Sequence, residues 1–182
     1  YTVNITVPSD HIVGSTGKLQ NASSVLTSEQ RKRWAKAQST YDTPVMIVTP
    51  EEALEAEKTK STEKKTWTFK ATNVRDFAFA SSRKFIWDAM AVDINGKNDM
   101  AVSYYPKEGN PLWEKYSTRV VAHTIKTYSK YTIDYPYHKA ISVHANRIGM
   151  EYPQICFNGG RPEADGTYSS ATKHGMISVI IH

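Results

Sequence analysis

The sequence predicts an α+β fold in which an antiparallel β unit is followed by a helix and further strands. Two observations carry this prediction. Within the first hundred residues, apolar and polar side chains alternate in several short runs, which is typical of half-buried strands. After Pro106 the pattern changes to one long run with apolar residues three and four positions apart, which is typical of a helix. We therefore expect two units, residues 1–101 and residues 102–182.

The first unit opens with strands and contains a helical insertion near residues 27–58. Residues 2–7 alternate strictly, and a turn with a second short strand is expected within residues 12–19. A helix is expected from Ser28 with a cap at Thr27 or Ser28, and a second helix from Pro50, where two acids follow the proline. Between the two helices, the apolar run at residues 45–48 predicts a strand.

The rest of the first unit is rich in β signals. Residues 61–65 are polar and are expected to be exposed, whereas residues 67–71 alternate as a strand does. An aromatic, β-rich stretch continues to Asp93. Asn95-Gly96 is the clearest hairpin turn in the chain, and residues 100–105 are expected to form the returning strand.

The second unit is expected to contain two helices and two strands. The first helix should run from Pro111 to about Tyr131, with Asn110 as its cap. Strands are expected at residues 141–144 and 148–152, followed by a loop at residues 158–170. The last helix should begin near Ser169 or Ser170, and its final part, residues 176–181, is apolar except for Ser178.

Composition limits the classes of function. Apolar residues make up 40% of the 182 residues and the net charge is +5, but the positive clusters at residues 31–36 and 58–65 are interrupted by other residues and lack interleaved aromatics. They predict solvated surfaces rather than a nucleic-acid interface. The single cysteine, Cys156, allows no internal disulfide, and no apolar run is long enough for a transmembrane helix. The compartment is left open by these observations.

Glu151 is a candidate binding residue because of the strand that carries it. Pro153 removes one donor from the ladder, which places such a strand at a sheet edge. An edge strand can pair with an extended peptide, and a carboxylate there can hold the peptide's terminal ammonium. Strand periodicity alone favours a solvated glutamate.

His182 is a candidate metal ligand, although a lone histidine at a helix end is most often no ligand. A zincin site needs H-E-x-x-H, with both histidines on one helical face. The other histidines form no ligand-spaced pair, and one imidazole cannot hold a catalytic zinc. Gly159-Gly160 is too short for a phosphate loop, and the acids Glu163 and Asp165 are expected to be solvated.

Two segments together resemble the aminopeptidase N-like zinc metallopeptidases, or gluzincins. Residues 143–153, V-H-A-N-R-I-G-M-E-Y-P, are similar to the strand and G-x-M-E-N-P segment of that family. Residues 178–182, S-V-I-I-H, resemble the approach to its H-E-x-x-H helix, and the order and separation match. Residues 67–80 are similar to the end of the family's N-terminal β domain. Residues 111–131 are similar to the first helix of its thermolysin-like catalytic domain.

The resemblance implies roles for four residues. Glu151 would bind the free α-amino group of a peptide substrate, Gly149 and Met150 would line the peptide cleft, and His182 would be the first zinc ligand. The family asparagine is Tyr152 here, so the specificity of this segment is an open question. In the parent enzyme, zinc would activate water and polarise the scissile carbonyl.

The resemblance further implies that the chain is a fragment ending at the first histidine of H-E-x-x-H. It would hold the end of the β domain and the first lobe of the catalytic domain. Such a fragment is expected to be inactive and to hold no zinc, and its apolar C-terminal segment could fray, pair as a strand or self-associate. The alternative is a non-catalytic, β-rich module that binds peptides or proteins.

Overall fold

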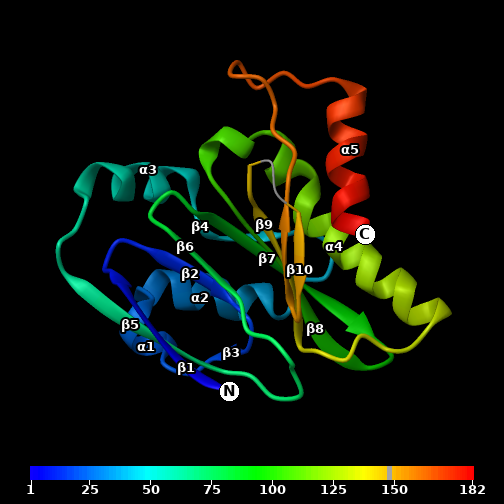
Figure 1. Ribbon diagram of the computed structural model, residues 1–182, viewed down its shortest axis with the longest axis horizontal. Coiled ribbons are helices and arrows are strands. Elements are labelled where there is room, and N and C mark those ends of the chain that lie inside the picture. The colour runs from blue at the N-terminus through cyan, green and yellow to red at the C-terminus, as the bar shows by residue number, and fades with distance from the viewer. Residues whose placement is uncertain (147–148) are drawn as a thin grey trace.

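A computed structural model describes residues 1–146 and 149–182 and shows an α+β fold, as predicted (Figure 1). The elements follow in this order: β1 (Thr2–Pro8), β2 (Ile12–Ser15), β3 (Lys18–Leu19), α1 (Ala22–Val25), α2 (Ser28–Ala37), β4 (Val45–Val48), α3 (Pro50–Thr59), β5 (Lys64–Lys70), β6 (Phe79–Ser82), β7 (Ile86–Ile94), β8 (Lys97–Tyr105), a 3-10 turn (Lys107–Gly109), α4 (Leu112–Tyr131), β9 (Lys139–His144), β10 (Met150–Tyr152), β11 (Ile155–Asn158) and α5 (Ser170–Ile181). Within the described residues, no helix combines the length and the apolar character needed to cross a membrane.

A six-stranded sheet forms the centre of the molecule, with the strand order β10-β11-β9-β8-β7-β4. Strands β4, β7 and β8 are antiparallel, β8, β9 and β11 are parallel, and β10 returns antiparallel at the edge. The parallel β8–β9 pair needs a long connection, and α4 lies within it. The β7–β8 hairpin turns at Asn95-Gly96, where both residues have the positive φ that a two-residue hairpin turn requires.

The two faces of this sheet are covered by different layers (Figure 1). Residues at alternate positions of β7, β8 and β9 pack against the N-terminal strands and α2, with Trp67, Trp87 and Ile141 among the buried side chains. The N-terminal strands form a three-stranded sheet, β1-β5-β3, and a two-stranded ribbon, β2-β6. The remaining positions face α4 and α5, with Ile125 and Trp113 at the centre of that side. We call these the strand-covered face and the helix-covered face.

The insertion near residues 27–58 contains the two predicted helices, and both begin with a capping box. Thr27 accepts a hydrogen bond from the backbone N–H of Gln30, whose side chain accepts one from the N–H of Thr27. Thr49 and Glu52 make the same exchange at the start of α3. Each box satisfies two N–H groups that would otherwise be unpaired at the helix start.

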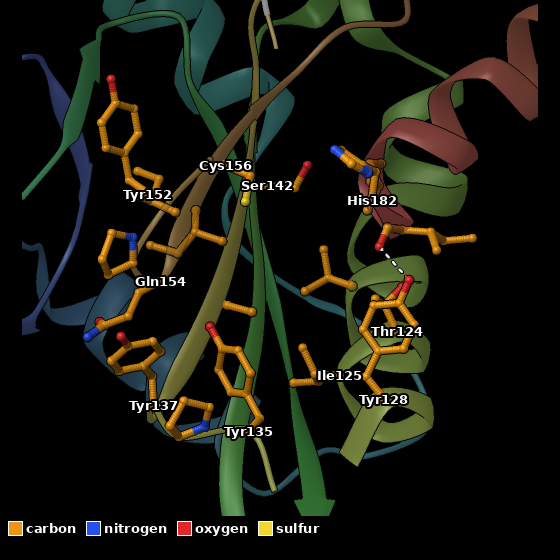
Figure 2. Close-up of a pocket in the computed structure, with 18 of the residues that line it drawn as sticks. Thr124, Ile125, Tyr128, Tyr135, Tyr137, Ser142, Tyr152, Gln154, Cys156 and His182 are labelled. Carbon is orange, nitrogen blue, oxygen red and sulfur yellow. Dashed lines mark hydrogen bonds between the residues drawn. The ribbon is translucent and has the colours of Figure 1, made fainter. Parts of the chain in front are cut away.

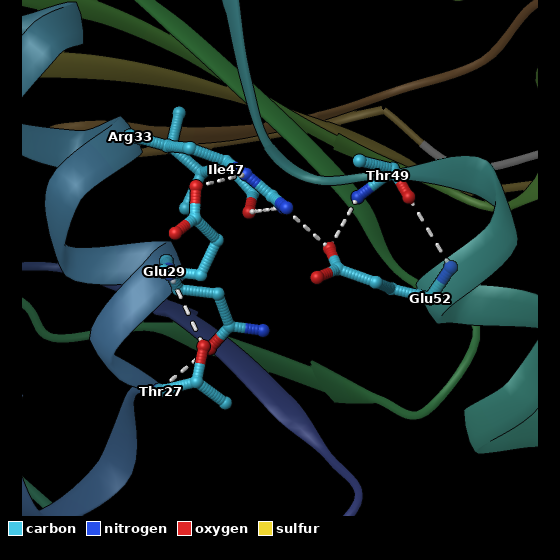
Figure 3. Close-up of polar contacts among 7 residues, drawn as sticks. Thr27, Glu29, Arg33, Ile47, Thr49 and Glu52 are labelled. Carbon is cyan, nitrogen blue, oxygen red and sulfur yellow. Dashed lines mark hydrogen bonds and ion pairs between the residues drawn. The ribbon is translucent and has the colours of Figure 1, made fainter.

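Arg33 joins these helices to the central sheet (Figure 3). Its guanidinium donates to the carbonyl of Ile47 in β4 at 3.1 Å and to the carboxylate of Glu52 in α3 at 2.7 Å. A second acid, Glu29, lies 3.6 Å from the Arg33 Nε atom. The insertion is therefore attached to the sheet through β4, which pairs with β7.

Several boundaries differ from the sequence-based expectation. The division between residues 101 and 102 falls inside β8, and the six-stranded sheet takes strands from both sides of it. Strand β5 begins at Lys64, within a stretch expected to be an exposed loop, because that end of the strand pairs with Pro8. Helix α4 begins at Leu112, while Asn110 still accepts a hydrogen bond from a backbone N–H in its first turn. The expected strand residue Ile148, with Arg147, lies outside the described residues.

Candidate functional site

The predicted edge strand is present as β10, which is the outermost strand of the sheet and pairs with β11. A two-residue turn, Pro153-Gln154, joins them, and Gln154 has a φ of 71° as the second residue of a type II turn does. The turn is held by the N-terminal part of the chain. Thr16 donates to the Pro153 carbonyl at 3.0 Å, and the Gly17 N–H donates to the Gln154 side chain at 3.0 Å. These bonds fix the position of β10.

Helix α5 is positioned by its cap and by one close contact. Ser169 accepts a hydrogen bond from the N–H of Thr172, which confirms the predicted start of the helix. Met176 is fully buried beside Gly160, where an added Cβ atom would lie 2.7 Å from the Met176 Cβ atom. Gly160 also has a φ of +113°, so glycine is required there on both grounds. Its carbonyl accepts a hydrogen bond from the Trp113 indole, which fixes α5 against α4.

The structure brings Glu151 and His182 together. The Glu151 Oε1 atom lies 3.1 Å from the His182 Nε2 atom, although the two residues belong to different elements. Both side chains are open to solvent, with exposed fractions of 57% and 79%. An exposed pair of this kind contributes roughly 0–1 kcal/mol to stability. Folding therefore gains little from it, and both groups are free to contact a bound molecule.

Gly149 and Met150 are exposed and lie beside Glu151 in the chain. Met150 pairs with Phe157, on the side of β10 opposite to Glu151, so it does not face His182. An added Cβ atom at Gly149 would meet its nearest neighbour at 4.0 Å, and packing therefore gives no reason for glycine at this position. The structure gives neither residue a contact with the Glu151–His182 pair, and their predicted role in a peptide cleft stays a prediction.

An apolar cavity of about 350 Å³ lies next to His182, between α4, the end of α5 and the sheet (Figure 2). Tyr128 of α4 closes one side by donating a hydrogen bond to the Ile181 carbonyl at 3.1 Å. Cys156 lines it from β11, and burial, with the nearby charge of Glu151, raises the pKa of its thiol. No sequence pattern indicated this cavity, because its walls come from segments far apart in the chain.

The groups beside this cavity offer too few ligands for zinc. A catalytic zinc takes three protein ligands. Among residues 1–146 and 149–182, no group of three or more His, Cys, Asp or Glu side chains could hold a metal ion. Glu151 and His182 offer one carboxylate and one imidazole, so these residues do not by themselves fit a zinc site.

Comparison with known proteins shows a shared fold at low sequence identity. No protein-family model and no curated protein matches the chain. An M1 zinc metallopeptidase mutant from Deinococcus radiodurans is similar over 98% of this chain and 32% of that one, with 11% identity and a TM-score of 0.55. A two-domain M1 zinc metallopeptidase mutant bound to L-arginine is similar over 100% of this chain and 33% of that one, with 11% identity and a TM-score of 0.57.

A third structure, an M1 zinc metallopeptidase from Deinococcus radiodurans, is similar over 87% of this chain and 29% of its own length, with 13% identity and a TM-score of 0.54. The chain thus spans about a third of the length of the solved structures that it matches. Structural similarity at such low sequence identity is evidence of a shared fold and not of a shared activity. The chain therefore has the fold of one part of the M1 zinc metallopeptidases.

Proposed function

We propose that this chain is part of a zinc-dependent aminopeptidase in which Glu151 holds the α-amino group of a peptide substrate. The observation that carries the proposal is the position of the Glu151 carboxylate, exposed on an edge strand and 3.1 Å from the His182 imidazole. The shared fold supports it, as does the fact that one protein of that fold binds L-arginine, which carries a free α-amino group.

The geometry suits recognition of a peptide's first residue. Among the described residues, no strand pairs with β10 on the side away from β11, and an edge strand can pair with an extended peptide. The carboxylate of Glu151 then accepts hydrogen bonds from the peptide's ammonium. A bond to a charged group contributes about 1.5–3 kcal/mol, which corresponds to roughly 10- to 150-fold in binding. Gly149 and Met150 are proposed to border the same cleft.

His182 is proposed as one zinc ligand, with the remaining ligands and the general base supplied by residues outside these 182. Because one imidazole cannot hold a catalytic zinc, the 182-residue chain alone is expected to be inactive. Incubation of this chain with zinc and leucine 4-nitroanilide should release nitroaniline no faster than zinc in buffer. A zinc-dependent release above that level would contradict the expectation.

The decisive test begins with the coding sequence that comes after His182, which should read E-x-x-H. A stop codon at that point would favour the alternative, a binding module without catalysis. The longer chain should then hydrolyse leucine 4-nitroanilide in a zinc-dependent manner. Glu151→Gln should lower kcat/KM by about 10- to 150-fold, the range given by the lost charged hydrogen bond.

A matched control is Glu163→Gln, which changes an exposed loop acid and should leave kcat/KM unchanged. A substrate with an acetylated amino group should be cleaved poorly by the unmodified enzyme and no worse by Glu151→Gln. If Glu151→Gln and Glu163→Gln behave alike on the free-amine substrate, Glu151 does not bind the amine.

Self-association through the C-terminal segment is proposed as a separate property of the 182-residue chain. Residues 170–181 are helical and not extended, so pairing as a strand is not what the structure shows. Ile181 is 37% exposed and lines the cavity beside α4, which leaves apolar surface at the end of α5. Light scattering after size exclusion should show a dimer at high concentration, and Ile181→Ser should shift it to monomer. A clean monomer throughout would contradict this.

A further inference from the structure

A second cavity, of about 220 Å³, lies on the strand-covered face, between the six-stranded sheet and the N-terminal strands. The sheet separates it from the Glu151–His182 pair, so binding in this cavity would be independent of the proposed peptidase function. Five aromatic rings form part of its wall. Trp34, Trp67, Phe69, Trp87 and Tyr104 all line it. A cavity of about 150 Å³ is sufficient for benzene, so this one has room for a larger ring.

The aromatic rings that line the cavity lie against one another. Trp87 lies between two other rings, with its centroid 5.3 Å from that of Trp34 and 5.4 Å from that of Tyr104. Trp67 and Phe69, on β5, are stacked with centroids 6.3 Å apart. Offset and tilted ring pairs at these separations are attractive, and a planar guest can make the same contacts.

Lys139 is the unusual side chain in this cavity. It is the first residue of β9, it points to the same face as Ile141, and it is only 8% exposed. Its ammonium lies 5.6 Å from the centre of the Phe69 ring. No aspartate or glutamate lines the cavity among the described residues, and none of them forms an ion pair with Lys139. Burial lowers the pKa of the Lys139 amine to about 7.

Two more donors in the cavity wall lack partners. The indole N–H groups of Trp67 and Trp87 are buried, and the described residues offer neither of them a hydrogen bond. Buried indole donors usually find an acceptor, and a buried donor without one costs free energy. Two unpaired buried donors beside one cavity, together with an ammonium that has no ion pair among the described residues, call for an acceptor that the fold does not supply. A methionine at position 139 would fill similar volume without this cost.

We propose that the cavity is a binding site for a small, flat aromatic molecule that carries a carboxylate. The ring would lie among Trp34, Trp87 and Tyr104, and the carboxylate would accept hydrogen bonds from Lys139 and from the unpaired indole donors. A carboxylate fits because it is an acceptor with several lone pairs, whereas every unmatched group in the wall is a donor. Lys18, which also lines the cavity and is exposed, adds a second positive charge near it.

The test uses the purified 182-residue chain and indole-3-carboxylate as the probe, with indole and tryptamine as comparisons. Calorimetry should give a Kd for indole-3-carboxylate at least tenfold below that of indole, and tryptamine should bind weakest of the three. Equal affinities for the carboxylate and for indole would overturn the proposal, as would no binding of the carboxylate at all, which would mean that the cavity holds water only.

Variants locate the site. Lys139→Met should weaken the binding of indole-3-carboxylate at least tenfold and leave the affinity for indole unchanged, because only the charged contact is lost. Lys64→Met removes an exposed lysine from β5 and should change neither affinity. Trp67→Phe keeps an aromatic ring in the wall and removes one donor, so it should weaken the binding of indole-3-carboxylate but not that of indole. If Lys139→Met and Lys64→Met give the same affinities, the molecule binds elsewhere and the proposal is wrong.

Discussion

Asp88 and Lys139 are buried ionisable side chains on opposite faces of the six-stranded sheet, and of these two only Asp88 has hydrogen-bond partners among the described residues. On the helix-covered face, Asp88 accepts hydrogen bonds from the hydroxyls of Tyr105 and Thr118, and the Thr118 hydroxyl oxygen also lies 2.7 Å from the hydroxyl oxygen of Ser103. On the strand-covered face, Lys139 lies against aromatic rings without a carboxylate beside it. A satisfied group is explained by the fold alone, because it fixes α4 on the sheet. An unsatisfied group needs a further explanation, which the proposed binding of an aromatic carboxylate supplies.

The largest expected effect that separates the two faces is in the pH dependence of stability. Burial raises the pKa of the Asp88 carboxyl to about 7, so between pH 4 and 7 the folded chain keeps a proton that the unfolded chain releases. The contribution of Asp88 to the free energy of unfolding is therefore greatest below about pH 4. It falls by up to about 4 kcal/mol as the pH rises to 7. Urea unfolding of Asp88→Asn, compared with the unmodified chain, should lack this loss.

Lys139 should give the opposite slope in a different pH window. Burial lowers the pKa of its amine to about 7, so between pH 7 and 10 the unfolded chain holds a proton that the folded chain lacks. Stability from this residue therefore rises with pH in that window, and Lys139→Met should remove the rise. Burial also lowers the pKa of His144 to about 4, which opposes the Asp88 slope. Subtracting the free energy of unfolding of each variant from that of the unmodified chain isolates the contribution of the substituted residue. If both differences are independent of pH, both assignments are wrong.

At a fixed pH of 7, substitutions at Asp88 and Lys139 should differ in their effect on the free energy of unfolding by roughly 1–3 kcal/mol. Asp88→Ala removes the acceptor of the buried Tyr105 hydroxyl, whereas Thr118 keeps Ser103 as a partner, and one orphaned buried group costs roughly 1–3 kcal/mol. Lys139→Met removes a donor that has no partner, so it should leave stability unchanged or higher. The free energies of unfolding in urea test this, and similar losses from both substitutions would show that Lys139 has a partner within the fold.

How much of this could be predicted from the sequence depends on the distance between partners along the chain. The cap at Thr27, the start of the last helix near Ser169 and the turn at Asn95-Gly96 were predicted correctly, because each is defined by residues a few positions apart. The edge position of β10 followed from Pro153, which removes a ladder donor. Local chemistry was thus sufficient for local structure.

The pairing between distant strands could not be predicted in this way. The boundary that we expected between residues 101 and 102 falls inside β8. It was misplaced because the sequence near residue 101 does not indicate that β8 pairs with the distant strand β9. Lys139 was not singled out either, since a lysine at a strand end is usually solvated. Its burial results from Phe69, some seventy positions earlier, which covers it after the two sheets pack. The close approach of Glu151 to His182 was expected only through the family resemblance.

A smaller effect should come from two neighbouring tyrosines on β8, which face opposite sides of the sheet. The Tyr105 hydroxyl donates to Asp88, whereas the described residues give the Tyr104 hydroxyl no hydrogen bond. Tyr105→Phe should therefore cost about 1–2 kcal/mol in the free energy of unfolding, and Tyr104→Phe close to none. Thermal or urea unfolding of the two variants tests it. A larger loss from Tyr104→Phe would mean that the strand-covered face has a polar contact of its own.

The smallest effect is expected at the sheet edge, where neither face buries the side chain. Glu151→Gln keeps the shape of the side chain and removes a charge that is 57% exposed, so it should change the free energy of unfolding by less than about 0.5 kcal/mol. Urea unfolding at pH 7 measures it beside Asp88→Asn, which removes the same charge from the buried network. A carboxylate that the fold does not need, on the edge strand of the described sheet, is free to act on something outside the chain. A loss of about 2 kcal/mol or more would instead make Glu151 a structural residue and remove the observation on which amine recognition depends.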